Sequence, residues 1–89
     1  MIKRTLPIIN KLGLHARAAT KLTAMANRYQ CEIRTGKQPP LVNAKSIMHL
    51  MLLAASQGTN LLFEFDGPDE QQACDDITQL LANYFDEGQ

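Results

Sequence analysis

The spacing of apolar residues changes repeatedly along this chain, and the changes limit the folds that it can adopt. In segments 2–9, 30–35 and 60–67 apolar side chains recur at every second position, which is the period of a β-strand. In segments 15–29, 46–58 and 68–85 they recur every three or four positions, as on one face of a helix. A short strand, 41–44, follows the turn-forming stretch GKQPP. The order β-α-β-β-α-β-α predicts an α+β domain in which three helices cover one face of a four-stranded, mainly antiparallel sheet.

Single residues make this prediction more specific. Pro7 has no backbone N–H to donate, so strand 2–9 is expected at an edge of the sheet. Ser46 is a favourable N-cap for helix 46–58, and Gly58 suits the position just after its end. Pro68 and the two acids after it suit the start of helix 68–85. The residues expected on the apolar faces are Ile2, Leu6 and Ile8; Ala19, Leu22, Ala26 and Tyr29; Cys31, Ile33 and Thr35; Leu50, Leu53 and Ala54; Leu61, Phe63 and Phe65; and Ala73, Ile77, Leu80, Leu81 and Tyr84.

Length and charge exclude several classes of protein. The 89 residues have no room for a second core, so we expect one domain over residues 1–89. Nine Lys and Arg balance nine Asp and Glu, whereas nucleic-acid binders and polybasic membrane-surface modules have a basic excess. No apolar run is long enough to span a bilayer and no signal-peptide pattern is present, so we expect a cytoplasmic protein that binds neither nucleic acid nor membranes. In that reducing compartment Cys31 and Cys74 are expected to be buried free thiols.

The stretch NKLGLHARAATKL, residues 10–22, places a histidine at the start of a helix. Gly13 permits a tight turn just before it. The first four N–H groups of a helix have no partner within it, so those of Ala16, Arg17 and Ala18 face outward and suit an anion such as phosphate. The positive end of the helix dipole disfavours a protonated imidazole. His15 is therefore expected to be a neutral ring with a nucleophilic nitrogen.

A phosphoryl group on His15 would be stabilised by the same features. Its oxygens could accept hydrogen bonds from the helix amides and from the guanidinium of Arg17. A lone histidine near a helix start is more commonly a polar surface residue or a cap, and the residues alone leave both interpretations open. His15, His49, Cys31 and Cys74 have no metal-ligand spacing, and no P-loop or catalytic triad is recognisable. We therefore expect no metal and no cofactor.

Helix 46–58 has more apolar residues than one buried face needs. Leu50 and its neighbours would suffice to pack on the sheet, yet Met48, Met51 and Leu52 project elsewhere. An exposed methionine-rich patch suits docking with more than one partner, although long side chains can also fold back over a core. Ser46 likewise allows two interpretations, because it can be a simple N-cap or a phosphorylation site beside this patch.

Three stretches, GLHARAA, VNAKSIMHLMLLAASQGT and DGPDEQQA, together with the length and element order, resemble the HPr family, the histidine-containing phosphocarriers of the bacterial phosphotransferase system. The resemblance implies an open-faced β-sandwich with antiparallel strand order 1-4-2-3. It implies that enzyme I, charged by phosphoenolpyruvate, phosphorylates Nδ1 of His15, and that the group then passes to a histidine of an enzyme IIA component. Arg17 matches the family's arginine beside the phosphoryl group.

The same resemblance implies regulation and a docking surface. Ser46 matches the serine that a dedicated HPr kinase/phosphorylase modifies in some bacteria. The implied protein is a monomeric carrier in sugar transport that forms transient complexes, rather than a self-contained enzyme, because one histidine and one arginine provide no substrate pocket. The residues expected at the docking surface are Ala16, Thr20, Ile47, Met48 and Met51.

One residue departs from the family pattern. The usual motif has proline after the arginine, and this chain has Ala18. Alanine also suits a first helical turn and restores an N–H there, so phosphotransfer is expected to survive the change. Two other functions stay open. One is a regulatory phosphocarrier of the nitrogen-related branch, and the other is a binding module with a vestigial histidine.

Overall fold

The computed structural model describes residues 1–86, so the last three positions of the expected 1–89 domain lie outside it. The strands and α-helices follow the predicted order and overlap the segments where the sequence indicates them, although β2 extends one residue beyond its predicted end and the 3-10 helix at the end was not predicted. They are β1 (Ile2–Pro7), α1 (Ala16–Ala26), β2 (Glu32–Gly36), β3 (Val42–Asn43), α2 (Ile47–Leu52), β4 (Asn60–Asp66), α3 (Glu70–Ala82) and the short 3-10 helix η1 (Tyr84–Asp86).

The four strands form one antiparallel sheet in the order β1-β4-β2-β3. The predicted α+β class and strand order 1-4-2-3 are therefore confirmed, and Pro7 lies on an edge strand as expected. β4 is paired on both sides, so that Phe65 lies opposite Ile2 in β1 and opposite Ile33 in β2. The middle of the sheet thus depends on the last strand in the chain.

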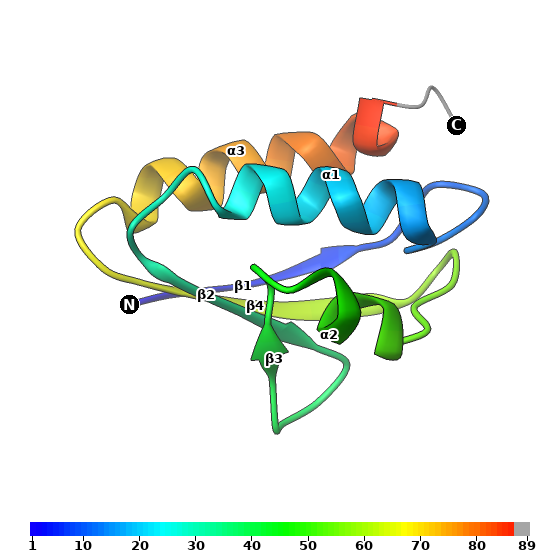
Figure 1. Ribbon diagram of the computed structural model, residues 1–89, viewed down its shortest axis with the longest axis horizontal. Coiled ribbons are helices and arrows are strands. Elements are labelled where there is room, and N and C mark those ends of the chain that lie inside the picture. Colours follow the sequence, from blue (N-terminus) through cyan, green and yellow to red (C-terminus); the bar gives the residue numbers. More distant parts are fainter. Residues whose placement is uncertain (87–89) are drawn as a thin grey trace.

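One face of the sheet is covered by helices, and the core lies between the two layers. Figure 1 shows α1 and α3 side by side above the sheet, with α2 near β3. Leu61, Phe63 and Phe65 of β4 have no solvent exposure, as their alternation predicts, because they point toward the helices. α2 packs against α1 and β3. Cys31 and Cys74 are buried free thiols, which confirms that prediction.

The second helix is shorter than the sequence indicates. It ends at Leu52 and not next to Gly58, and Ala54 has a left-handed backbone with φ of 51°. The prediction that Ala54 shares the buried face is wrong, since Ala54 is exposed and Ala55 is buried instead. The reason is tertiary: residues after the helix bond to the segment that follows β1. The Gly58 N–H donates to the Ile8 carbonyl at 2.7 Å, which a continued helix would prevent.

Both ends of the third helix also differ from the prediction. The helix begins at Glu70 with Asp69 as N-cap, so Pro68 lies outside it. At the other end the helix stops at Ala82, and the chain turns through residues with positive φ. The expected place of Tyr84 in the apolar stripe is wrong. Tyr84 is exposed, and the turn buries Phe85 in its place.

Candidate functional site

The loop between β1 and α1 is held against the segment that follows α2. Gly13 is buried and has φ of +68°, the left-handed conformation that its position in the sequence suggests. A Cβ at this position would lie 2.5 Å from the Ala55 carbonyl oxygen, so only glycine fits. The next N–H, that of Leu14, donates to the same Ala55 carbonyl at 2.8 Å. These contacts fix where the helix begins.

His15 is the N-cap of α1. Its backbone is extended, and its carbonyl accepts from the Ala19 N–H at 2.8 Å to close the first helical turn. Its side chain turns back over the helix end, where Nδ1 accepts from the Arg17 N–H at 3.2 Å. Because an acceptor nitrogen must have its lone pair free of a proton, this bond corresponds to the neutral ring with its proton on Nε2. Nδ1 of His15 therefore faces the backbone N–H groups at the start of α1.

The surroundings of His15 suit an added negative charge. Ala16 and Arg17 are exposed, His15 is half-buried, and Ala18 is packed into the core. The first turn of α1 has no acidic residue. An anion on Nδ1 would therefore meet backbone N–H groups and the positive end of the helix dipole. The structure brings together the residues that the sequence indicates for phosphate binding, His15 through Ala18.

An apolar patch lies on α1 and α2, which pack against each other. We call it the α1–α2 patch. Met48 is 76% exposed and Met51 is 47% exposed, so these side chains do not fold back over the core. Leu50 alone of this helix is buried. The residues of the patch are Ala16, Thr20, Ile47, Met48 and Met51, all of them exposed.

Ser46 and Leu12 precede α2 and α1, respectively. Ser46 caps α2, because its Oγ accepts from the His49 N–H at 3.3 Å. Leu12 lies in the loop before His15 and is 71% exposed, and the periodicity of the sequence does not predict this exposed leucine. A leucine between Lys11 and Gly13 in a polar turn is the signal that could have identified it.

The cysteines do not contribute a nucleophile. Burial is the main cause that raises the pKa of the Cys31 thiol to about 11, and the nearby Asp69 carboxylate adds to it. Asp69 itself accepts from the Gln30 and Cys31 N–H groups at 2.8 and 2.9 Å, and the first of these bonds is the main cause that lowers its pKa. A thiol with so high a pKa is protonated and unreactive at neutral pH. The Asp69 hydrogen bonds connect the start of α3 to the residues just before β2 and stabilise the fold.

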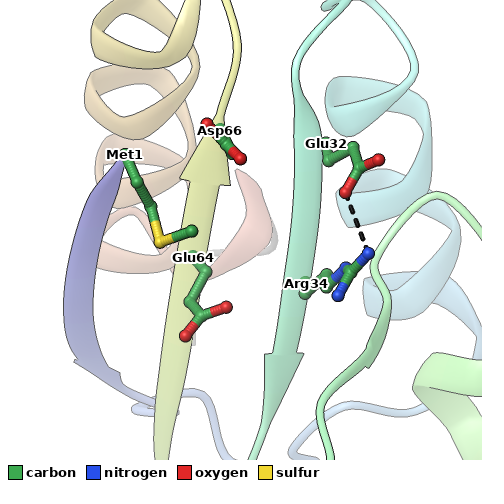
Figure 2. A pocket seen from close by; sticks show the side chains of 5 residues that line it. All are labelled: Met1, Glu32, Arg34, Glu64 and Asp66. Atoms are coloured by element: carbon green, nitrogen blue, oxygen red, sulfur yellow. Dashed lines mark hydrogen bonds and ion pairs between the residues drawn. The ribbon is translucent and has the colours of Figure 1, made fainter.

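A shallow pocket lies on the uncovered face of the sheet, away from His15. Figure 2 shows its lining residues on β2, β4 and the chain start, where Arg34 pairs with Glu32 at 2.9 Å. Lys3 pairs with Glu64 of the same pocket at 3.8 Å. Residues 1–86 contain no group of three or more His, Cys, Asp or Glu side chains that could hold a metal ion. The pocket is thus lined mainly by charged side chains, and His15 is not among its lining residues.

Comparisons with known proteins show to which family the chain is related. Residues 2–83 match the family model described as PTS HPr component phosphorylation site. The chain is 48% identical over 89 residues to the phosphocarrier protein HPr of Cupriavidus necator, with full coverage of both chains. It is 51% identical over 83 residues to that of Pseudomonas aeruginosa, covering 92% of each.

A solved structure gives the same result for the fold. HPr-C-His from Thermoanaerobacter tengcongensis superposes with a TM-score of 0.93 at 38% identity, and the match covers 98% of each chain. In the described part of the chain no helix has the length and apolar character needed to cross a membrane.

Proposed function

The chain belongs to the HPr family of phosphocarrier proteins, and from this premise we propose that Nδ1 of His15 accepts a phosphoryl group from phospho-enzyme I and donates it to enzyme IIA components. The observation that supports this most directly is the hydrogen bond from the Arg17 N–H to Nδ1. It leaves a lone pair on the nitrogen at the helix end. The family relationship comes from the comparisons, and the hydrogen bond to Nδ1 supports the choice of this atom.

The transfer step needs little chemistry from this chain. The lone pair of Nδ1 attacks phosphorus, a nitrogen–phosphorus bond forms, and the bond from phosphorus to the donor breaks with its electron pair leaving on the donor. The Arg17 N–H then donates to a phosphoryl oxygen instead of to the ring. The amides of Ala16 and Ala18 and the guanidinium of Arg17 belong to the first turn of α1, in which Ala16 and Arg17 are exposed, and they would supply further donors.

The stabilisation of the phosphorylated form is moderate. A helix terminus contributes about 0.3–1 kcal/mol to an exposed anion, and one hydrogen bond to a charged group contributes about 1.5–3 kcal/mol. A carrier needs values of this size, because a group held more firmly could not be passed on. The partners supply the other catalytic groups, so the chain acts as a carrier rather than a self-contained enzyme.

The α1–α2 patch is the surface proposed to dock both donor and acceptor. All nine Lys and Arg residues lie within positions 1–45, whereas eight of the nine Asp and Glu residues lie within positions 64–87. Ala16 and Thr20 of the patch lie within the first range, next to Arg17 and Lys21, and the other three patch residues lie between the two ranges, where the chain has no acidic residue. Partners with an apolar centre and an acidic rim would complement it, and their association should weaken as salt is added.

Ser46 is the proposed site of regulation by an HPr kinase/phosphorylase. Its hydroxyl caps α2 directly beside Ile47 and Met48. A phosphate there would add about 1.5 to 2 negative charges at neutral pH, and it would still suit the helix start. The helix would persist, while docking to an acidic partner would weaken.

The same chemistry serves two branches. We place the chain in the cytoplasm as a monomer that forms transient complexes in sugar transport. A regulatory role in the nitrogen-related branch is the second candidate, and the enzyme I that phosphorylates the chain would distinguish the two. The intact Ser46 within the NAKS stretch favours the first.

The test is phosphorylation by enzyme I with labelled phosphoenolpyruvate and Mg²⁺. We expect acid-labile label in the wild-type protein, none in His15→Ala, and wild-type labelling in His49→Ala, since His49 is an exposed histidine on α2 outside the site. A folded wild-type protein that takes up no label from its own organism's enzyme I would overturn the proposal. Normal partner binding without label would favour a binding module with a vestigial histidine.

A further inference from the structure

Asn10 is a fully buried polar residue that the proposed mechanism does not use. It has no solvent exposure, although it lies in the loop that leads to His15. Its Nδ2 donates to the Gly13 carbonyl at 2.7 Å, and the Gly13 N–H donates to the Asn10 carbonyl at 3.1 Å. These reciprocal bonds close the turn between residues 10 and 13.

The turn holds the peptide unit between Gly13 and Leu14 by a hydrogen bond on each side. The Gly13 carbonyl and the Leu14 N–H belong to the same planar unit. Asn10 Nδ2 binds its oxygen at 2.7 Å, and the Ala55 carbonyl binds its N–H at 2.8 Å. A plane held at both ends cannot rotate, and Leu14, which is 5% exposed, anchors the next residue in the core. His15 follows directly, so its position over the helix end depends on this clamp.

Asn10, like Thr35 and Thr78, buries a side-chain oxygen that has no partner among the described residues. Its Oδ1 is buried and has no hydrogen-bond partner among residues 1–86. A buried polar atom without a partner is unfavourable, and such atoms are rare in native proteins. An apolar side chain would avoid this cost but could not hold the Gly13 carbonyl. Strained or unsatisfied groups of this kind are concentrated at functional sites.

We propose that Asn10 is a positioning residue for phosphotransfer, which fixes the Gly13–Leu14 peptide and thereby sets the place of His15 Nδ1 over the amides of α1. The proposal rests on the proposed function of His15. Small displacements of a reacting atom reduce rates strongly, and a shift of about 1 Å can cost on the order of a hundredfold. The docking residues lie on α1 and α2, whereas the hydrogen bonds of Asn10 join it to Gly13.

The test compares Asn10→Ala and Asn10→Asp with two control variants. Asn10→Asp keeps the shape of the side chain but replaces the amide donor with oxygen. Gln57→Ala removes an exposed hydrogen bond to the Ile9 carbonyl in the same loop. Ile77→Val shortens a buried side chain in α3 and controls for lost stability.

We expect both Asn10 variants to lower the rate of phosphorylation at saturating enzyme I by roughly tenfold or more, with the half-saturating concentration unchanged. The NMR signals of the His15 ring should shift in both Asn10 variants while those of His49 stay unchanged, and both control variants should match the wild type. The proposal would be overturned if the rate at saturating enzyme I and the NMR signals of His15 were both unchanged. It would also be overturned if the variants changed only the half-saturating concentration of enzyme I. If the wild type takes up no label, the proposed function fails, and the NMR comparison still tests the positioning.

Discussion

Replacing Gly13 with alanine should destabilise the fold more than the same change at any open glycine. The left-handed backbone at φ of +68° costs an L-residue about 1–2 kcal/mol. The new Cβ would also lie 2.5 Å from the Ala55 oxygen and 2.9 Å from the Ser56 Cα, both backbone atoms that cannot turn away. Overpacking of this kind costs about 1–3 kcal/mol. Gly13→Ala should therefore lose about 2–5 kcal/mol of folding free energy.

Gly58 provides the matched control, because it isolates the backbone strain. Its φ is +92°, yet a Cβ there would meet no atom within 4 Å. Gly58→Ala should thus lose only the strain, about 1–2 kcal/mol. The difference between the two variants, about 1–3 kcal/mol, measures the contact of Gly13 with the segment after α2.

Urea unfolding followed by circular dichroism measures both losses. The slope against urea concentration should stay the same, so that midpoints can be compared directly. Equal losses in the two variants would refute the reasoning, since the Ala55 contact would then contribute nothing. A change of slope in Gly13→Ala would instead show that the loop had opened in the folded state.

Four further changes test other parts of the structure. Ser46→Ala removes the cap of α2 and should cost about 1 kcal/mol in urea unfolding, whereas no loss would show that the cap is idle. Ala18→Pro should leave the phosphotransfer rate within roughly tenfold of wild type, because Ala19 is the first residue whose N–H bonds within α1, and a gain of several orders of magnitude would contradict this. The lowered pKa of Asp69 means that its contribution to stability is complete above the ordinary value of 3.8 and is lost as pH falls through the folded value, so Asp69→Asn should flatten the acid side of the stability curve. Cys31, with its pKa of about 11, should react with a thiol reagent only as fast as the protein opens, and rapid labelling of the native state would contradict its burial.

The sequence predicts the elements well because their local patterns and tertiary roles agree. The alternation of Leu61, Phe63 and Phe65 predicts a strand with one buried face, and the sheet provides that face. His15 was identified because an N-cap position and a following arginine are both visible in the sequence. The residues alone leave the phosphoryl chemistry of His15 and the docking role of Met48 and Met51 open, and the family resemblance favours both and adds Ala16 and Thr20.

The failures share a physical cause, which is competition from distant parts of the chain. Residues 53–58 continue a helical pattern, but the Ile8 and Leu14 backbone groups bond to this segment and unwind it. Tyr84 continues the stripe of α3, but a left-handed turn exposes it and buries Phe85. Asn10 was missed because nothing in a turn sequence shows that its side chain is buried. The bonds from Ile8 and Leu14 to residues 55–58 join positions more than forty apart, where local patterns carry no information.

The central place of β4 has a consequence for synthesis on the ribosome. β1 and β2 both pair with β4, and between themselves they share no ladder, so neither has its main partner until residues 60–66 have been made. At about 5–20 residues per second, the gap between the end of β1 and the start of β4 takes about 3–10 s to translate. During that interval the apolar face of α1 has no sheet to cover it. We therefore expect the β1–β4 and β2–β4 pairs to form only after residues 60–66 have been made.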